Sequence, residues 1–220
     1  MPFGSLSSFA TSFACGGIED VGLGLSWDAS RLADEVSRRA AVLSQMDIGC
    51  GSVVAIAHGG TARFFADLFA TWSVGAAAAC LDSSLTPAEL RTVVEFAKSA
   101  VLLVNGAASV NQLSVPVIDL SSESPKSGSA AATRLAPDDA ALVLFTSGTT
   151  GAPKGVVLTF GAVEARIAAA KGELTSLEAT RDKAFADIAA SKAELAVLQG
   201  GLAQAHRDFD ALTLKLKRGN

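Results

Sequence analysis

The sequence is poor in the residues that build disulfide-rich and zinc-binding proteins. It has three cysteines and two histidines among 220 residues. Cys15, Cys50 and Cys80 show none of the paired spacings of a disulfide framework or a metal site. Because only His58 and His206 could add further ligands, we predict no zinc site. Unpaired thiols are typical of reducing compartments, so we predict a cytoplasmic setting.

Long apolar runs are also lacking. The most apolar stretch without a charge, Leu68 to Leu81, is shorter than the roughly 20 residues that a membrane-spanning helix needs. Residues 1–17 lack the basic start of a signal peptide, and the three residues before Cys15 match a lipoprotein cleavage site only loosely. We therefore predict no membrane span.

The charge is low and unevenly distributed. The net charge of −4 argues against nucleic acid as a partner. Residues 1–160 hold nine basic and fourteen acidic side chains, whereas residues 161–220 hold nine basic and eight acidic ones. This difference predicts two regions of different kind, divided at about residue 160.

The first region alternates between apolar strand-like runs and amphipathic helices. Strands are predicted over 21–27, 53–57, 76–81, 101–104, 117–120, 142–145 and 156–158. Helices are predicted over 31–46, 61–74 and 86–99. Such alternation is typical of a parallel α/β sheet.

Local signals define where the helices begin and which side chains they bury. Asp28 or Ser30 caps the first helix and Thr61 the second, and Thr86-Pro87-Ala88-Glu89 has the form of a capping box. Five apolar side chains of the second helix are predicted to pack inward: Phe64, Phe65, Leu68, Phe69 and Trp72. His58-Gly59-Gly60 is interpreted as a turn, with His58 an ordinary turn residue rather than a ligand-facing one.

The most informative segment is 142–158, where a strand enters a loop rich in glycine and hydroxyl groups and leaves it as another strand. Gly148, Gly151 and Gly155 can adopt positive φ and bring backbone N–H groups close to a ligand. Hydroxyl donors come from Thr146, Ser147, Thr149 and Thr150, and Lys154 adds a positive charge. Together these donors predict a nest for phosphate oxygens. The loop is not a Walker A motif, because Pro153 precedes the lysine and Gly155 follows it.

This loop closely resembles the phosphate-binding signature of the adenylate-forming superfamily, which includes acyl-CoA synthetases and nonribosomal-peptide adenylation domains. The match is nearly unbroken from Thr146 to Gly155, and the order of strands and helices extends the resemblance over about 20–160. The resemblance implies the N-terminal, parallel-sheet α/β subdomain of such an enzyme. It also implies ATP and Mg²⁺ as cofactors and a carboxylic acid as the substrate, which is activated as an acyl adenylate. The implied cofactor-binding residues are Thr146, Ser147, Gly148, Thr149, Thr150, Gly151, Lys154 and Gly155, with Lys154 in the catalytic role.

The sequence departs from the family after the loop. No Tyr-Gly-x-Thr-Glu run exists, and the chain contains no tyrosine. Phe160 stands where relatives often carry histidine. The adenine pocket, the magnesium carboxylate, the ribose-binding aspartate and the lysine of a small C-terminal domain cannot be placed. The resemblance therefore implies a truncated or split enzyme that is inactive alone.

A seven-residue repeat takes over from about Gly161. Its a positions are Ile167, Leu174, Arg181, Ile188, Leu195, Leu202, Phe209 and Leu216, and its d positions are Ala170, Leu177, Ala184, Ser191, Leu198, Ala205 and Leu212. All except Arg181 and Ser191 are apolar, which predicts a long helix that associates with itself or with a partner helix through 163–217. Gly200-Gly201 leaves a helical hairpin open as an alternative to one coiled-coil helix, and an amphipathic helix on the domain's own surface is a further one.

Three interpretations of the whole chain stay open. It is one piece of a split ligase whose helix docks the missing piece, or a non-catalytic scaffold in which a relic AMP-binding subdomain carries an oligomerisation helix. The third is a rearranged gene product without a selected function.

Overall fold

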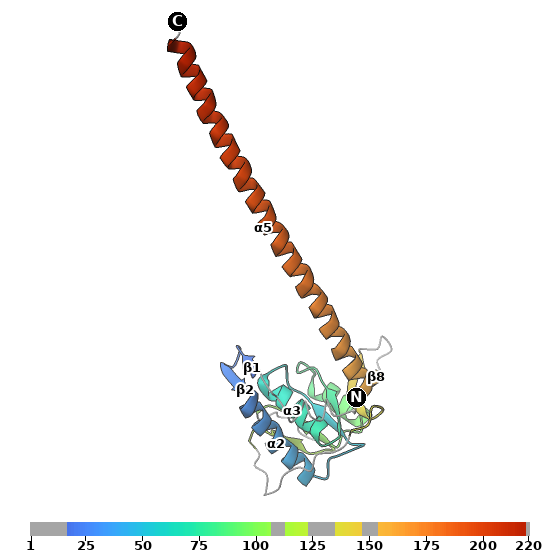
Figure 1. Ribbon diagram of the computed structural model, residues 1–220. Helices are drawn as coiled ribbons and strands as arrows, with labels where there is room; N and C mark the ends of the chain where they lie inside the picture. Colours follow the sequence, from blue (N-terminus) through green and yellow to red (C-terminus); the bar gives the residue numbers. More distant parts are fainter. Residues whose placement is uncertain (1–16, 107–112, 123–134, 147–153, 219–220) are drawn as a thin grey trace. The chain divides into compact units, whose positions relative to one another are not determined.

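The computed structural model describes residues 17–106, 113–122, 135–146 and 154–218 (Figure 1). The chain divides into two compact units, residues 1–166 and 167–220. The elements of the first unit are β1 (Gly17–Asp20), β2 (Leu25–Asp28), α2 (Ala29–Gln45), β3 (Val53–Ile56), α3 (Ala62–Ser73), β4 (Ala77–Cys80), α4 (Pro87–Phe96), β5 (Val101–Leu103), β6 (Val117–Ile118), β7 (Ala140–Thr146) and β8 (Lys154–Thr159). Helix α5 (Phe160–Arg218) begins in the first unit and makes up the described part of the second. The domain boundary that we predict at residue 160 stays a prediction.

The first unit is built on a six-stranded sheet with the strand order β6-β5-β3-β4-β7-β8. Neighbouring strands from β6 to β7 run parallel, and β8 runs antiparallel to β7 at one edge. The predicted parallel α/β sheet is therefore confirmed, with one antiparallel edge strand added.

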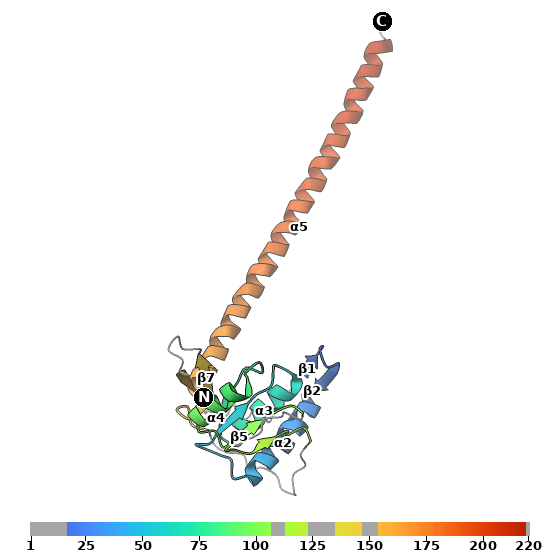
Figure 2. The ribbon, with the colours of Figure 1, turned by 180° about the vertical axis from the view of Figure 1, so that it is seen from behind.

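Each face of the sheet has its own apolar core, because alternate residues of a strand point to opposite faces. On one face Val54 and Ile56 of β3 pack with residues of α2 and α3. On the other face Ala55 packs with residues of α4, such as Leu90 and Val94. Figure 2 shows α4 and the sheet from the side opposite to Figure 1. The sheet is thus enclosed between helices.

The predicted helix starts are confirmed. Asp28 accepts a hydrogen bond from the Arg31 N–H at 2.8 Å, and Thr61 accepts one from the Phe64 N–H at 3.2 Å. At the start of α4, the Thr86 side chain and Glu89 form both halves of a capping box. Each cap satisfies an N–H group that has no partner within its own helix.

Two details of the sequence prediction are wrong. The strand predicted over 21–27 is in fact the turn, residues 21–24, and most of β2 in a hairpin whose first strand, β1, precedes the predicted range. The Asp20 carboxylate accepts the Leu23 N–H at 3.0 Å, and Gly24 has a φ of 61°, so polar turn chemistry interrupts the apolar pattern. Phe65 is also misplaced: it is exposed, whereas Leu68 and Trp72 on the same helix are buried as predicted.

Helix α5 runs without interruption through Gly172, Gly200 and Gly201, so the chain does not fold back at the glycine pair. In the heptad numbering these glycines fall at f and g positions, away from the a and d positions, where a missing side chain costs no packing. Every residue from Ala165 to Leu212 is exposed. The predicted long helix is confirmed. Its 59 residues correspond to about 90 Å at 1.5 Å per residue.

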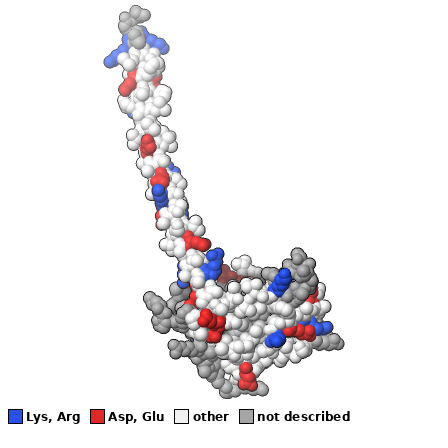
Figure 3. All heavy atoms as spheres, turned by 90° about the vertical axis from the view of Figure 1, so that its right-hand side faces the viewer, with Lys and Arg blue, Asp and Glu red and all other residues white. Residues whose placement is uncertain are grey.

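The exposed surface of α5 is unusual in its apolar content. Twelve large apolar side chains lie exposed on it: Ile167, Leu174, Leu177, Phe185, Ile188, Leu195, Val197, Leu198, Leu202, Phe209, Leu212 and Leu214. On the side of the helix seen in Figure 3, charged groups lie among uncharged ones, and basic groups gather near the C-terminal end. Within the described parts of the chain, no helix is long and apolar enough to cross a membrane.

Candidate phosphate-binding site

The hairpin of β7 and β8 brings together the two ends of the predicted phosphate loop. Thr146, the last residue of β7, pairs directly with Lys154, the first residue of β8, and Phe145 pairs with Gly155. The other predicted site residues, Ser147, Gly148, Thr149, Thr150 and Gly151, lie outside the described residues. The structure thus joins the first and last parts of the predicted site and does not describe the donors between them.

Gly155 does not adopt the positive φ that the loop pattern allows for it, and its part in phosphate binding stays a prediction. It lies in β8 and is not among the described glycines with positive φ, so its backbone is an ordinary strand. A Cβ atom placed there would lie 3.5 Å from the rings of Phe96 and Phe145, which is ordinary contact distance. Gly155 therefore does not owe its place to a left-handed conformation.

The hairpin is anchored to the core of the first unit. The buried Trp72 indole Nε1 donates to the Ala141 carbonyl of β7 at 2.9 Å. The ring of Phe160, which is fully buried, packs edge-on against Trp72 at 5.9 Å. Phe160, the residue that replaces the family's frequent histidine, is thus a core residue at the exit of β8. These contacts hold both ends of the loop on a rigid base.

Lys154 is exposed at the start of β8. Its ammonium group is therefore open to solvent, and its backbone pairing with Thr146 places Lys154 beside the end of β7. Since β3, β4, β5 and β7 are parallel, the end of β7 lies at the same sheet edge as the carboxyl ends of the other three. This is the edge where open α/β sheets bind their ligands.

A second polar group lies at the carboxyl ends of the parallel strands, and the sequence does not predict it. His58 follows β3 and is buried, and its Nε2 lies 2.8 Å from Asp67 Oδ2. Asp67 Oδ1 in turn accepts from Arg39 Nε at 2.7 Å, and Arg39 also pairs with Glu35. His58 is therefore part of a polar network with Glu35, Arg39 and Asp67, of which all but Glu35 are buried, and not the ordinary turn residue that we predict from sequence.

The network is enclosed by aromatic side chains. The Arg39 guanidinium lies 5.8 Å from the centre of the Trp27 ring, and the Phe64 ring meets His58 edge-on at 6.0 Å. Burial raises the pKa of the Glu35 carboxyl, but hydrogen bonds and charge from Arg38 and Arg39 outweigh it and hold this pKa below its ordinary value. The Glu35 carboxyl is therefore held in its ionised form beside Arg38 and Arg39, which suits a structural role of the network.

Two other kinds of site find no support among the described residues. Cys80, at the end of β4, is partly buried, and burial raises the pKa of its thiol to about 11. It is therefore not a thiolate nucleophile at neutral pH. In the parts of the chain that the structure describes, no three histidine, cysteine or carboxylate side chains are grouped to hold a metal ion.

The comparisons with known proteins agree with this arrangement. The family model described as AMP-binding enzyme matches residues 21–197, most of the chain, and extends into α5. A hybrid PKS-NRPS synthetase, pydA of an Acremonium species, is 34% identical over 154 residues, which are 66% of this chain and 4% of the synthetase.

Solved structures show the same similarity. The N-terminal subdomain of NpsA from Klebsiella oxytoca, in complex with 3-hydroxybenzoyl-AMSN, has a TM-score of 0.55 at 25% identity, over 62% of this chain and 35% of that one. The o-succinylbenzoate CoA synthetase MenE of Bacillus subtilis, in complex with the acyl-adenylate intermediate OSB-AMP, has a TM-score of 0.55 at 27% identity, over 62% and 37%. The chain thus spans a small part of the synthetase and little more than a third of each solved chain.

The mixed sheet, with its glycine-rich loop between β7 and β8, is the N-terminal subdomain architecture of adenylate-forming enzymes. The family match covers more than half of the chain. The chain belongs to the AMP-binding enzyme family, as the sequence resemblance predicts.

Proposed function

We propose that this chain holds the phosphates of ATP at residues 146–155 and takes part in the activation of a carboxylic acid as its acyl adenylate. The observation that carries the proposal is the direct pairing of Thr146 with Lys154, which closes the loop of hydroxyl and glycine residues on a single exposed cation. The relatives support it: MenE is solved with an acyl adenylate bound.

The residues of the loop suit the β- and γ-phosphates of ATP. Backbone N–H groups and hydroxyls donate to phosphate oxygens, and the Lys154 ammonium offsets the negative charge that develops when the α-phosphate is attacked. A magnesium ion, where bound, would add further positive charge at the phosphates. Among the described residues, no three histidine, cysteine or carboxylate side chains are grouped to hold it, so we assign no step to the metal.

We further propose that catalysis needs polypeptide beyond the residues of this chain. Strand β8 is an edge of the sheet, and its apolar side chains Val156 and Val157 are 49% and 58% exposed. In the described part of the chain, no strand pairs with the outer side of β8. An exposed apolar edge strand is a ready site for a further strand. That strand would belong to the part that supplies the base, metal and carboxylate contacts.

Pyrophosphate exchange tests the proposal. The purified chain alone is expected to show no ATP–pyrophosphate exchange above background with a panel of fatty and aromatic acids, because phosphate contacts alone do not align the acid with the α-phosphate. Adding a polypeptide that carries the remaining family segments is expected to produce exchange that depends on Lys154. Robust exchange by the chain alone would refute the need for further polypeptide, and exchange unaffected by Lys154→Ala would refute the site.

The apolar surface of α5 favours a second candidate function, that of an oligomerisation scaffold carrying a non-catalytic AMP-binding subdomain. Nine of the twelve exposed large apolar side chains fall on the a and d positions of the heptads. An apolar stripe of this length is unusual on a helix without a partner. We propose the cytoplasm as the compartment for both candidate functions.

Light scattering on the intact chain tests self-association. We expect a dimer that becomes a monomer in the double variant Leu195→Asp plus Leu198→Asp, because both aspartates would be buried in the interface. Lys183→Asp, at an outward-facing position of the same helix, is the matched control and should stay dimeric. A monomeric starting chain would contradict the scaffold and leave the proposed phosphate site standing.

A further inference from the structure

The heptads of α5 contain two polar residues, and their positions restrict how a second helix can pack. Arg181 is at an a position and Ser191 at a d position, while their neighbours on this stripe are apolar. The Arg181 side chain is exposed and bonds only with the adjacent Asp182 in the described structure, through Nε at 2.9 Å. Such an exposed ion pair contributes little to stability. The guanidinium can therefore leave Asp182 and bind a partner helix at a small cost in free energy.

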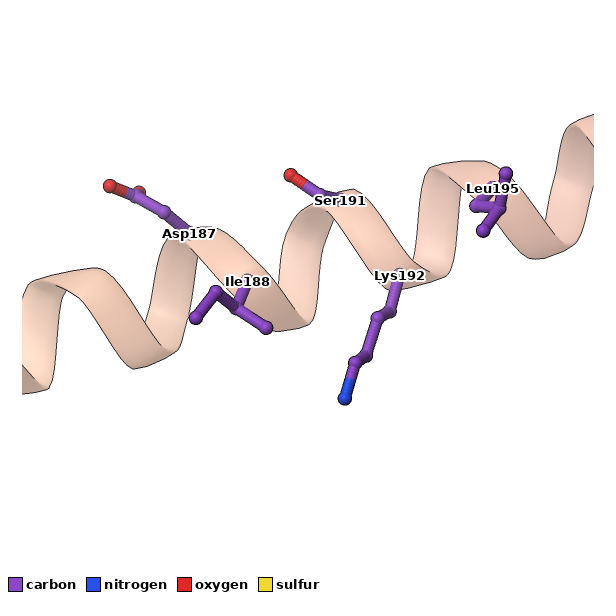
Figure 4. Close-up of a pocket in the computed structure, with 5 residues that line it drawn as sticks. All are labelled: Asp187, Ile188, Ser191, Lys192 and Leu195. Carbon is purple, nitrogen blue, oxygen red and sulfur yellow. The ribbon is translucent and has the colours of Figure 1, made fainter.

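A hollow on the surface of α5 surrounds the second of these residues. It is lined by Asp187, Ile188, Ser191, Lys192 and Leu195, and Figure 4 shows that all five come from consecutive turns of the one helix. Four of them follow the spacing i, i+3, i+4, i+7. This is the set of four residues that receives one side chain from a facing helix in a coiled coil.

We propose that α5 pairs with α5 of a second copy of this chain in antiparallel orientation, with Arg181 of each copy inserted into the hollow around Ser191 of the other. This rests on the self-association proposed above and adds its orientation and register. In the hollow the guanidinium meets the Ser191 hydroxyl and the Asp187 carboxylate, so the polar seam residues of the two copies satisfy each other.

This register also matches large side chains to small ones. In antiparallel pairing each a residue lies opposite a d residue of the partner, so setting Arg181 against Ser191 determines all the other layers. The a–d layers are Ile167–Ala205, Leu174–Leu198, Ile188–Ala184, Leu195–Leu177 and Leu202–Ala170. Every alanine therefore faces isoleucine or leucine, which fills the core at even density. In a parallel, in-register pair the alanines would face alanines and leave gaps.

The residues at the e and g positions, which flank the a and d positions, also fit this register. Glu178 of one copy lies opposite Lys192 of the other, twice by symmetry, and the off-seam Phe185 meets its own counterpart at the twofold axis. The like-charged contact of Asp187 with its counterpart is offset by the inserted Arg181. Charges at these positions set partner orientation in coiled coils.

The competing arrangements fit less well. A shift by one heptad in either direction places Arg181 opposite Leu198 or Ala184 and turns Glu173 toward an acidic residue. A parallel pair sets Arg181 against Arg181 and Glu173 against Glu178. In that pair the guanidinium groups repel each other at a core position.

Disulfide cross-linking of the full-length chain tests the register. The background is Cys15→Ser plus Cys50→Ser; Cys80 is retained, because its raised pKa of about 11 leaves it largely protonated and unreactive at neutral pH. In this background, chains with Leu174→Cys are mixed with chains with Leu198→Cys and oxidised. The mixed disulfide is the expected main product. Phe185→Cys alone should also cross-link to itself.

Control variants distinguish this register from a parallel pair and from antiparallel pairs shifted by one heptad. Leu174→Cys alone should not cross-link, because its two copies would be about 36 Å apart in the antiparallel pair. Leu174→Cys mixed with Ala205→Cys is one heptad out of register and should give no mixed product. Efficient cross-linking by Leu174→Cys alone would establish a parallel pair and overturn the proposal. A dimer by light scattering without the Leu174–Leu198 product would overturn the register while leaving self-association intact, and a monomer would overturn both.

Discussion

Replacing Asp67 by alanine is expected to destabilise the first unit by roughly 3–5 kcal/mol, the cost of removing one partner from a buried ion pair. Asp67 is 3% exposed and receives hydrogen bonds from both Arg39 and His58. Arg39 is 1% exposed, so without Asp67 its guanidinium stays buried with only Glu35 as a charged partner. The expected loss is therefore much larger than that of an exposed salt bridge.

Denaturant titration followed by tryptophan fluorescence measures this effect. The chain has two tryptophans, Trp27 and Trp72, and both are buried in the first unit, so the signal is independent of the second. Asp34→Ala, which removes an exposed carboxylate from α2, is the matched control and should change the free energy of unfolding by less than about 0.5 kcal/mol. A loss below about 1 kcal/mol for Asp67→Ala would show that the network is not a stabilising unit.

A double replacement separates the charge from the packing. Arg39→Met plus Asp67→Leu removes both charges and restores apolar volume, and buried ion pairs replaced in this way often lose no stability. We expect the double variant to unfold at higher denaturant concentration than Asp67→Ala. If it is equally unstable, the contact of His58 with Asp67 and that of Trp27 with Arg39 account for the lost stability instead.

The parts of the fold that sequence predicts well depend on local signals. The caps at Asp28, Thr61 and Thr86 act within three residues, and the apolar strand runs are continuous, so both can be read from a short window. The long helix is equally local, since its seven-residue period persists through Gly172 and the glycine pair. The hairpin of β1 and β2 is missed because the apolar residues Val21 and Leu23 of its four-residue turn look like the start of a weak strand.

The parts that sequence misses depend on partners far apart in the chain. Asp67 lies 28 residues from Arg39 and nine from His58, so their pairing follows from how α2, α3 and the end of β3 pack. One signal was available: a charged residue occupies an inward-facing position in each of the two amphipathic helices. A buried charge requires a partner, and two such residues of opposite sign predict each other. In the same way, the loop composition predicts a phosphate site, but the strand conformation of Gly155 follows from its pairing with Phe145.

Replacing Lys154 by alanine is expected to abolish measurable binding of both ATP and pyrophosphate. Lys154 is the single cation of the 146–155 loop, and a charge-assisted hydrogen bond contributes about 1.5–3 kcal/mol, which corresponds to a roughly 10- to 150-fold loss of affinity. Binding to the unaltered chain should itself be weak, because an exposed lysine competes with water and salt for the phosphates. A loss of this size therefore takes the affinity out of the measurable range.

Isothermal titration calorimetry with ATP and with pyrophosphate distinguishes a phosphate site from a full nucleotide site. We expect equal affinity for the two ligands, since the proposed contacts are to phosphate alone, and lower affinity at higher ionic strength. Lys154→Arg, which keeps the charge, should retain part of the binding, and Lys183→Ala, which removes an exposed lysine from α5, should retain all of it. If ATP binds tightly and this binding survives Lys154→Ala, the nucleotide sits elsewhere on the chain, and the loop between β7 and β8 is not its site.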